Sequence, residues 1–96
     1  MQYFHRTQLA PDAVIVAATG YFGAHLTPTH EASRRCGFAG ALGGVTVTVR
    51  AEGGHYTLIT VATDQPGESE LDRLAKRFLG EVHRLADPAH SLRGAY

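Results

Sequence analysis

Residues 45–63, V-T-V-T-V-R-A-E-G-G-H-Y-T-L-I-T-V-A-T, carry the strongest structural signal in this chain. Two runs rich in β-branched residues flank a turn at Gly53 and Gly54, which is the pattern of a β-hairpin. We expect this hairpin to form the centre of a sheet, with the other elements placed to cover it.

The length of the hairpin loop decides which side chains share a face of the sheet. A three-residue loop, Glu52-Gly53-Gly54, pairs Ala51 with His55 and puts Val45, Val47 and Val49 on one face with Thr57, Ile59 and Val61. A two-residue Gly53-Gly54 loop matches the valines instead with Tyr56, Leu58, Thr60 and Ala62, because a slip of one residue reverses every side chain. We favour the three-residue loop because it gathers the β-branched residues on one face.

A strand and a helix are predicted at the start of the chain. Residues 2–9 favour a short strand, which Pro11 ends. Pro11 and Asp12 suit the first turn of a helix, and apolar residues at helical spacing continue it to Leu26. Gly20 and Gly23 weaken this helix, and their position near one face would let it approach a sheet closely.

The segment between this helix and the hairpin has no clean periodicity. We place one strand over residues 32–39, bent or bulged at Gly37, since glycine inside a strand often marks a bulge. Gly43 and Gly44 then turn the chain into the hairpin.

A long amphipathic helix is predicted near the C-terminus. Ser69 suits its N-cap, with Asp72 at the third helical position as a variant of the capping box. The apolar residues follow helical spacing: Leu71, Leu74, Ala75, Phe78, Leu79, Val82, Leu85 and Ala86. Asp87 and Pro88 end the helix, and we expect residues 87–96 to form a short tail.

These elements predict a single α+β domain over residues 1–96, in the order β-α-β-β-β-α, with two helices on one face of an antiparallel sheet of about four strands. Pro11-Asp12, residues 45–63 and residues 71–85 together resemble small helix-grip or TATA-binding-protein-like α+β units. Helix-grip proteins of the START and polyketide-cyclase type carry more strands than 96 residues allow. DNA-binding members of the second group are tandem basic repeats, whereas this chain is single and neutral, so the resemblance implies fold and not function.

Composition narrows the classes of partner. Nine basic and nine acidic residues give zero net charge, which argues against a nucleic-acid binder and a polybasic membrane anchor. The longest apolar run, residues 13–18, is too short to span a bilayer. A neutral chain has little resistance to self-association. The single cysteine, Cys36, cannot form an internal disulfide, and we expect a reducing, cytoplasmic compartment.

No catalytic, cofactor or metal motif stands out, so we expect neither catalysis nor a bound cofactor or metal. Arg34 and Arg35 precede Cys36 and could lower its pKa, although a cysteine in a strand is more often a small buried hydrophobe. His25, His30 and Cys36 could approach a metal ion, but they lack the paired short spacings of metal sites.

The second face of the hairpin is the most informative surface. It carries a single charge among Thr46, Thr48, Arg50, Tyr56, Leu58, Thr60 and Ala62. Exposed sheet faces usually carry more charge. We therefore predict a non-catalytic domain with a structural or binding role that forms a homodimer through its sheet, with an interface at Thr46, Thr48, Tyr56, Leu58 and Thr60.

Two other interpretations of this surface remain open. One is a binder of a small apolar ligand, or a degenerate cyclase-like enzyme, with a pocket between sheet and helices and polar contacts from Tyr21, His25, Arg50 and Tyr56. The other is a threonine-rich face that simply lies in solvent.

Overall fold

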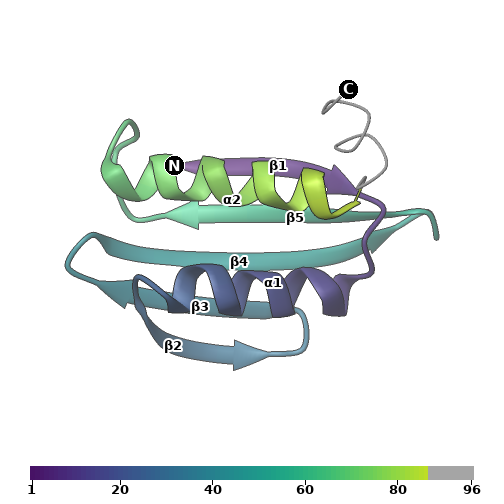
Figure 1. Cartoon of the computed structure of the whole chain (residues 1–96), viewed down its shortest axis with the longest axis horizontal. Coiled ribbons are helices and arrows are strands. Elements are labelled where there is room, and N and C mark those ends of the chain that lie inside the picture. Colours follow the sequence, from purple (N-terminus) through teal and green to yellow (C-terminus); the bar gives the residue numbers. More distant parts are fainter. Residues whose placement is uncertain (87–96) are drawn as a thin grey trace, which may run out of the picture.

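The computed structural model describes residues 1–86, so the predicted tail at 87–96 lies outside the described part. The elements are β1 (Gln2–Thr7), α1 (Pro11–Gly23), β2 (Thr27–Ala32), β3 (Arg35–Gly40), β4 (Gly43–Glu52), β5 (Tyr56–Thr63) and α2 (Glu70–Ala86). The strands form one antiparallel sheet in the order β1-β5-β4-β3-β2, with the predicted hairpin at its centre (Figure 1). The α+β class and the antiparallel sheet are confirmed, but the sheet has five strands and not about four.

The additional strand comes from the segment without periodicity. Residues 27–40 form two strands, β2 and β3, joined by a turn at Ser33 and Arg34, where one bent strand was expected. All six residues of β2 are exposed, so burial imposes no alternation on its sequence. Pro28 is tolerated because β2 is an edge strand, and the register shifts between Pro28 and His30.

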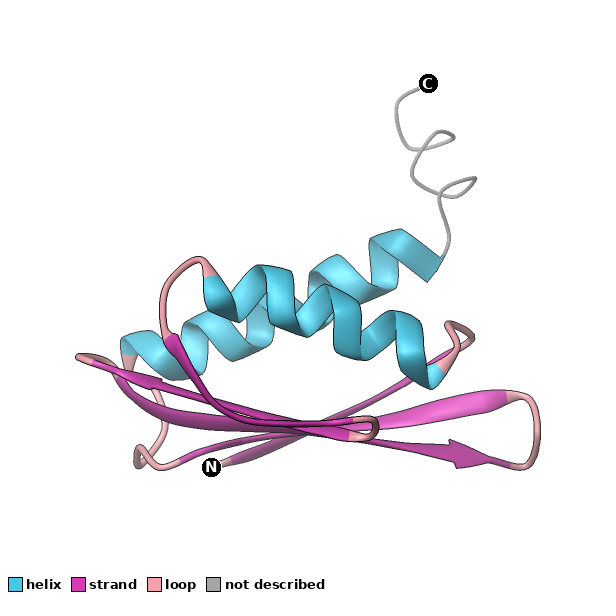
Figure 2. Ribbon diagram, turned by 90° about the horizontal axis from the view of Figure 1, so that it is seen from below, coloured by secondary structure: helices cyan, strands magenta, loops and turns pink. Residues whose placement is uncertain are grey.

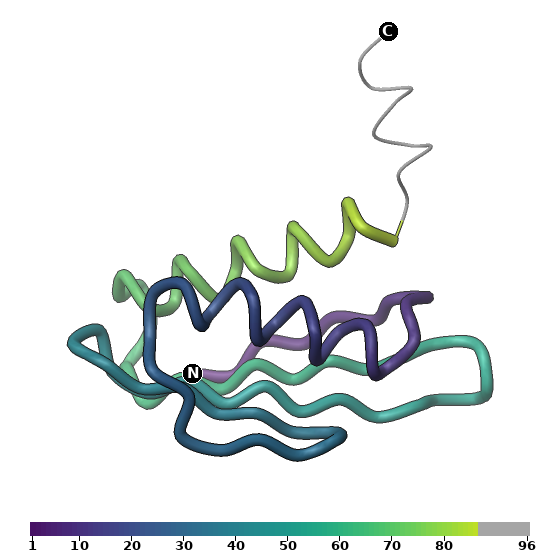
Figure 3. Tube along the Cα trace, turned by 60° about the horizontal axis from the view of Figure 1, so that its bottom comes forward, coloured from purple at the N-terminus to yellow at the C-terminus, as the bar shows by residue number. Residues whose placement is uncertain are grey.

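Both helices cover the same face of the sheet (Figure 2). α1 contacts β3 and β4, whereas α2 contacts β1 and β5. The chain crosses from β1 at one edge to β2 at the opposite edge through α1, and β3, β4 and β5 then fill the space between them (Figure 3).

Aromatic side chains join the helices to the sheet. The Phe22 ring centroid lies 5.1 Å from that of Phe78 on α2 and 5.6 Å from that of Phe38 on β3. All three rings are buried. The rest of the core comes mainly from Val14, Ala18, Val45, Val47, Val49, Ile59, Val61, Leu71 and Val82.

The hairpin loop has three residues, but they are Gly53, Gly54 and His55. Glu52 pairs with Tyr56, and Ala51 pairs with Thr57 where His55 was expected. This change shifts the register by two residues, so the predicted faces are preserved: the valines lie on the buried face with Ile59 and Val61. Gly53 and Gly54 have φ values of 60° and 75°, which glycine adopts without steric cost.

The predictions for the helices differ in outcome. α2 matches its expected range, and the Ser69 cap is confirmed, because Ser69 Oγ accepts a hydrogen bond from the Asp72 amide at 3.1 Å. α1 ends at Gly23, earlier than expected. The predicted close approach at Gly20 and Gly23 is wrong, since a Cβ atom added at either glycine would have no neighbour within 4 Å.

Candidate functional site

The outer face of the sheet is open within the described part of the chain. Neither helix covers it (Figure 2). Strand pairing places on it the five residues predicted for an interface and, beside them, Phe4 and Arg6 of β1. We call the part of this face formed by Phe4 and the outward residues of β5 the open-face patch, which consists of Phe4, Tyr56, Leu58, Thr60 and Ala62.

The open-face patch extends further than the sequence suggested. Phe4 pairs with Thr60 across the β1–β5 ladder and is 61% exposed, while Tyr56 is 49% exposed. Leu58, Thr60 and Ala62 are half-buried. Phe4 was missed because the alternation in β1 is imperfect, and only the pairing of β1 with β5 shows that it continues this patch.

Two arginines and one glutamate lie beside the patch on β1 and β4 and pair with one another. Arg6 Nε donates a hydrogen bond to Glu52 Oε1 at 2.8 Å, and an Arg50 guanidinium NH2 donates to Glu52 Oε2 at 3.2 Å. The hydrogen bonds from Arg6 and then Arg50 lower the pKa of Glu52. Such exposed ion pairs add little stability, and none of the five residues of the patch itself is charged.

The four predicted ligand contacts do not form one site. Tyr21 on α1 and His25, which follows α1, line a shallow groove of about 320 Å³ between the two helices. Arg50 and Tyr56 lie on the outer face of the sheet, beyond the core. The space between helices and sheet, where the pocket was expected, is occupied by the buried rings of Phe22, Phe38 and Phe78 and their aliphatic neighbours.

The residues considered for a metal ion are also separated. Cys36 is 1% exposed on the buried face of β3, while His25 and His30 are exposed on other segments. Burial, and secondarily Glu31, raises the pKa of the Cys36 thiol to about 11, so the neighbouring arginines do not activate it. Within residues 1–86, no three or more His, Cys, Asp or Glu side chains gather as a metal site would require.

Asp72 is a fully buried carboxylate that joins α2 to two strands. It accepts hydrogen bonds from Tyr3 Oη at 2.8 Å, Thr63 Oγ1 at 2.9 Å and Ser69 Oγ at 2.5 Å. Burial raises its pKa, but these hydrogen bonds outweigh that effect and lower it to about 2. The carboxylate already accepts these hydrogen bonds and is inaccessible to solvent, so we assign it a structural role.

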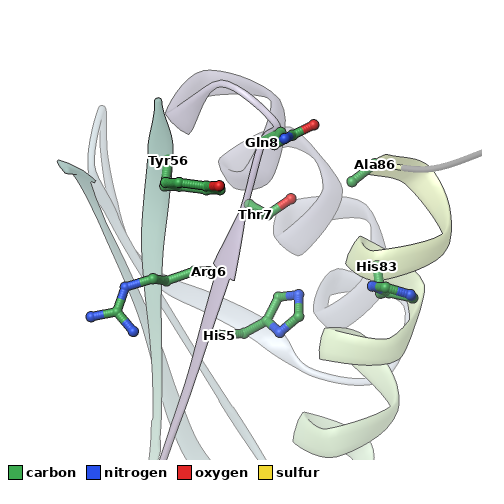
Figure 4. Close-up of a pocket in the computed structure, with 7 residues that line it drawn as sticks. All are labelled: His5, Arg6, Thr7, Gln8, Tyr56, His83 and Ala86. Atoms are coloured by element: carbon green, nitrogen blue, oxygen red, sulfur yellow. The ribbon is translucent and has the colours of Figure 1, made fainter. Parts of the chain in front are cut away.

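A polar pocket of about 380 Å³ lies between the end of β1 and the last turn of α2 (Figure 4). His5 extends from β1 toward α2, and the His5 and His83 ring centroids are 6.2 Å apart at an interplanar angle of 80°. The pKa of His5 is lowered by burial and then by the charge of His83. Arg6 and Tyr56 line the pocket from β1 and β5, together with Thr7, Gln8 and Ala86.

The sequence contained no sign of this pocket, because His5 and His83 are far apart in the chain and have no motif spacing. Only the packing of α2 against the edge strand β1 brings the two rings together.

Comparisons with protein-family models, curated proteins and solved structures return no match for this chain. In the part of the chain that the structure describes, neither helix has the length and apolar character needed to cross a membrane.

Proposed function

We propose that this domain is non-catalytic and binds a second copy of itself through the outer face of its sheet, with a structural or binding role. The observation that carries the proposal is the open-face patch on a sheet whose two helices both lie on the opposite side (Figure 2). Apolar residues gathered in one patch on an uncovered surface are typical of protein interaction sites.

Charge and size favour a second copy as the occupant. The net charge is zero, so two copies approach without overall repulsion. The molecule extends 38 Å by 31 Å by 21 Å, and the sheet lies in the plane of the two longer dimensions (Figure 1). A stable interface buries about 800 Å² per partner, which a face of these dimensions is large enough to provide.

The ligand-binding alternative has weaker support. It requires room between the helices and the sheet. The rings of Phe22, Phe38 and Phe78 occupy that layer: the Phe22 centroid lies 5.1 Å from that of Phe78 and 5.6 Å from that of Phe38. Self-association needs no rearrangement of this core.

Sedimentation velocity over a range from low to high micromolar concentration tests the proposal. We expect the wild-type mass to rise from that of one chain to that of two. A lysine in the patch, Phe4→Lys or Leu58→Lys, should keep the protein monomeric over the same range, because the charge would be buried without a partner.

Val16→Lys is the matched control. Val16 is 72% exposed on α1, on the helical side of the molecule, so this variant adds the same charge away from the patch and should dimerise like wild type. A wild-type protein that stays monomeric at the highest concentration, or a Val16→Lys variant that dissociates as readily as Phe4→Lys, would overturn the proposal.

A further inference from the structure

We propose that the two copies bind in one orientation, in which Phe4 of each copy inserts into a groove on the outer face of its partner. The inference rests on the proposed self-association and adds which parts of the two faces meet. The groove has a volume of about 380 Å³, and its lining includes Ala39, Gly44, Thr46 and Ala62 from three neighbouring strands. Phe4 and the groove lie on the same face of the sheet, so a single two-fold rotation forms both contacts.

The shape of the outer face favours this arrangement. Phe4 is 61% exposed on the edge strand β1. In the groove, Ala39 pairs with Gly44 across β3 and β4, so neither strand carries more than a methyl group there. If the two copies met with Phe4 against Phe4, the rings would hold the faces apart and leave both grooves empty. Phe4 in the partner's groove fills that space instead, as the dense packing of stable interfaces requires.

The lining of the groove holds one charged residue, Asp64. Its carboxylate accepts hydrogen bonds from Gln65 Nε2 at 2.8 Å and from the Gly44 amide at 3.0 Å. These two hydrogen bonds, and to a smaller extent the Met1 ammonium, lower the pKa of Asp64, so the carboxylate is ionised at neutral pH. Arg35 lies on the same face of the sheet but lines a neighbouring groove and not this one.

The charges beside Phe4 are complementary to this acidic groove. Arg6 lies on the same face of β1, and Arg6 and Arg50 share one acceptor, Glu52, so this cluster has one positive charge in excess. Contact between Phe4 and the groove brings the cluster toward the partner subunit's Asp64. Contact between the two Phe4 rings would place one positive cluster beside the other, and like charges that face each other across an interface oppose binding.

Nuclear magnetic resonance on a mixture of isotope-labelled and unlabelled full-length chains tests the inference. Within one chain, β1 and β3 are three steps apart in the sheet, which separates Phe4 from Ala39 by about 14 Å. We expect a nuclear Overhauser effect between the Phe4 ring and the Ala39 methyl group that arises only between copies. A dimer with contacts between the two Phe4 rings, and none between Phe4 and Ala39, would overturn the inference and leave the proposed dimer standing. A chain that stays monomeric would overturn both.

Two substitutions give an independent test by sedimentation velocity. Ala39→Leu fills the groove and Phe4→Ala removes the ring that occupies it, so each should weaken the dimer by roughly tenfold or more. The double variant should bind more tightly than Ala39→Leu alone, because the leucine then occupies the space that the ring has left. Ala13→Leu is the matched control, since Ala13 is exposed on α1 and the same change there should leave the dimer unaffected. Single variants with wild-type affinity, or a double variant weaker than both, would overturn the inference.

Discussion

The buried carboxylate of Asp72 offers the sharpest test of how this fold is held together. It joins α2 to β1 through Tyr3 and to β5 through Thr63, and it closes the cap with Ser69. Substitution by alanine removes the acceptor for three hydroxyl donors at once. The Thr63 hydroxyl is buried and would lose its carboxylate partner, whereas Tyr3 and Ser69 are partly exposed and can regain water.

The expected cost follows from these contacts. A hydrogen bond to a charged group contributes about 1.5–3 kcal/mol, and bonds that share one acceptor do not add fully, so we expect Asp72→Ala to lower the free energy of unfolding by roughly 3 kcal/mol. For a domain of this size, this loss corresponds to a fall in melting temperature of roughly 12–24 °C.

The pH dependence of stability gives an independent check. The pKa of Asp72 falls from 3.8 in the unfolded chain to about 2 in the fold. A lowered pKa means that the carboxylate stabilises the fold above the unfolded value and that this contribution disappears as pH falls through about 2. The difference in stability between wild type and Asp72→Asn should therefore narrow steadily as the pH is lowered from 4 toward 2.

Urea unfolding followed by circular dichroism measures both effects. Glu70→Gln is the matched control, because Glu70 is an exposed acid in the same first turn and should contribute only about 0.3–1 kcal/mol through the helix dipole. Tyr3→Phe should destabilise wild type and have almost no effect in the Asp72→Ala background. An Asp72→Ala variant as stable as Glu70→Gln, or a difference that does not change with pH, would refute this account of the carboxylate.

Three further expectations concern single positions. Cys36 is buried with a pKa raised to about 11, so iodoacetamide at pH 8 should label it only after unfolding in urea; labelling of the native protein at the rate of the unfolded chain would contradict this. Gly43 has a φ of 121°, and an added Cβ would lie 2.5 Å from Gln65 Nε2, so Gly43→Ala should lower the free energy of unfolding by about 1–3 kcal/mol. Gly20→Ala, in an exposed helix position with free space around it, should instead raise it by about 0.5–1 kcal/mol, and equal effects of the two substitutions in thermal melts would count against this distinction.

The sequence alone predicted the elements whose one buried face imposes a period on them. α2 was predicted close to its observed range because its apolar residues follow helical spacing and Ser69 and Asp72 form a recognisable cap. The predicted assignment of side chains to the two faces of the hairpin was also correct, since the valines and Ile59 share the buried side. The predicted register was wrong by two residues. The predicted faces were nevertheless right, because side chains in a strand return to the same face every two residues.

Only the tertiary structure decided the features that depend on contacts between distant segments. β2 was missed because an edge strand with no buried residue has no hydrophobic period to detect. The pairing of β1 with β5 places Phe4 in the open-face patch. The packing of α2 on β1 places the ring of His5 beside that of His83. Local sequence patterns record which side of an element is buried, whereas they carry no information about which exposed side chains the fold brings together.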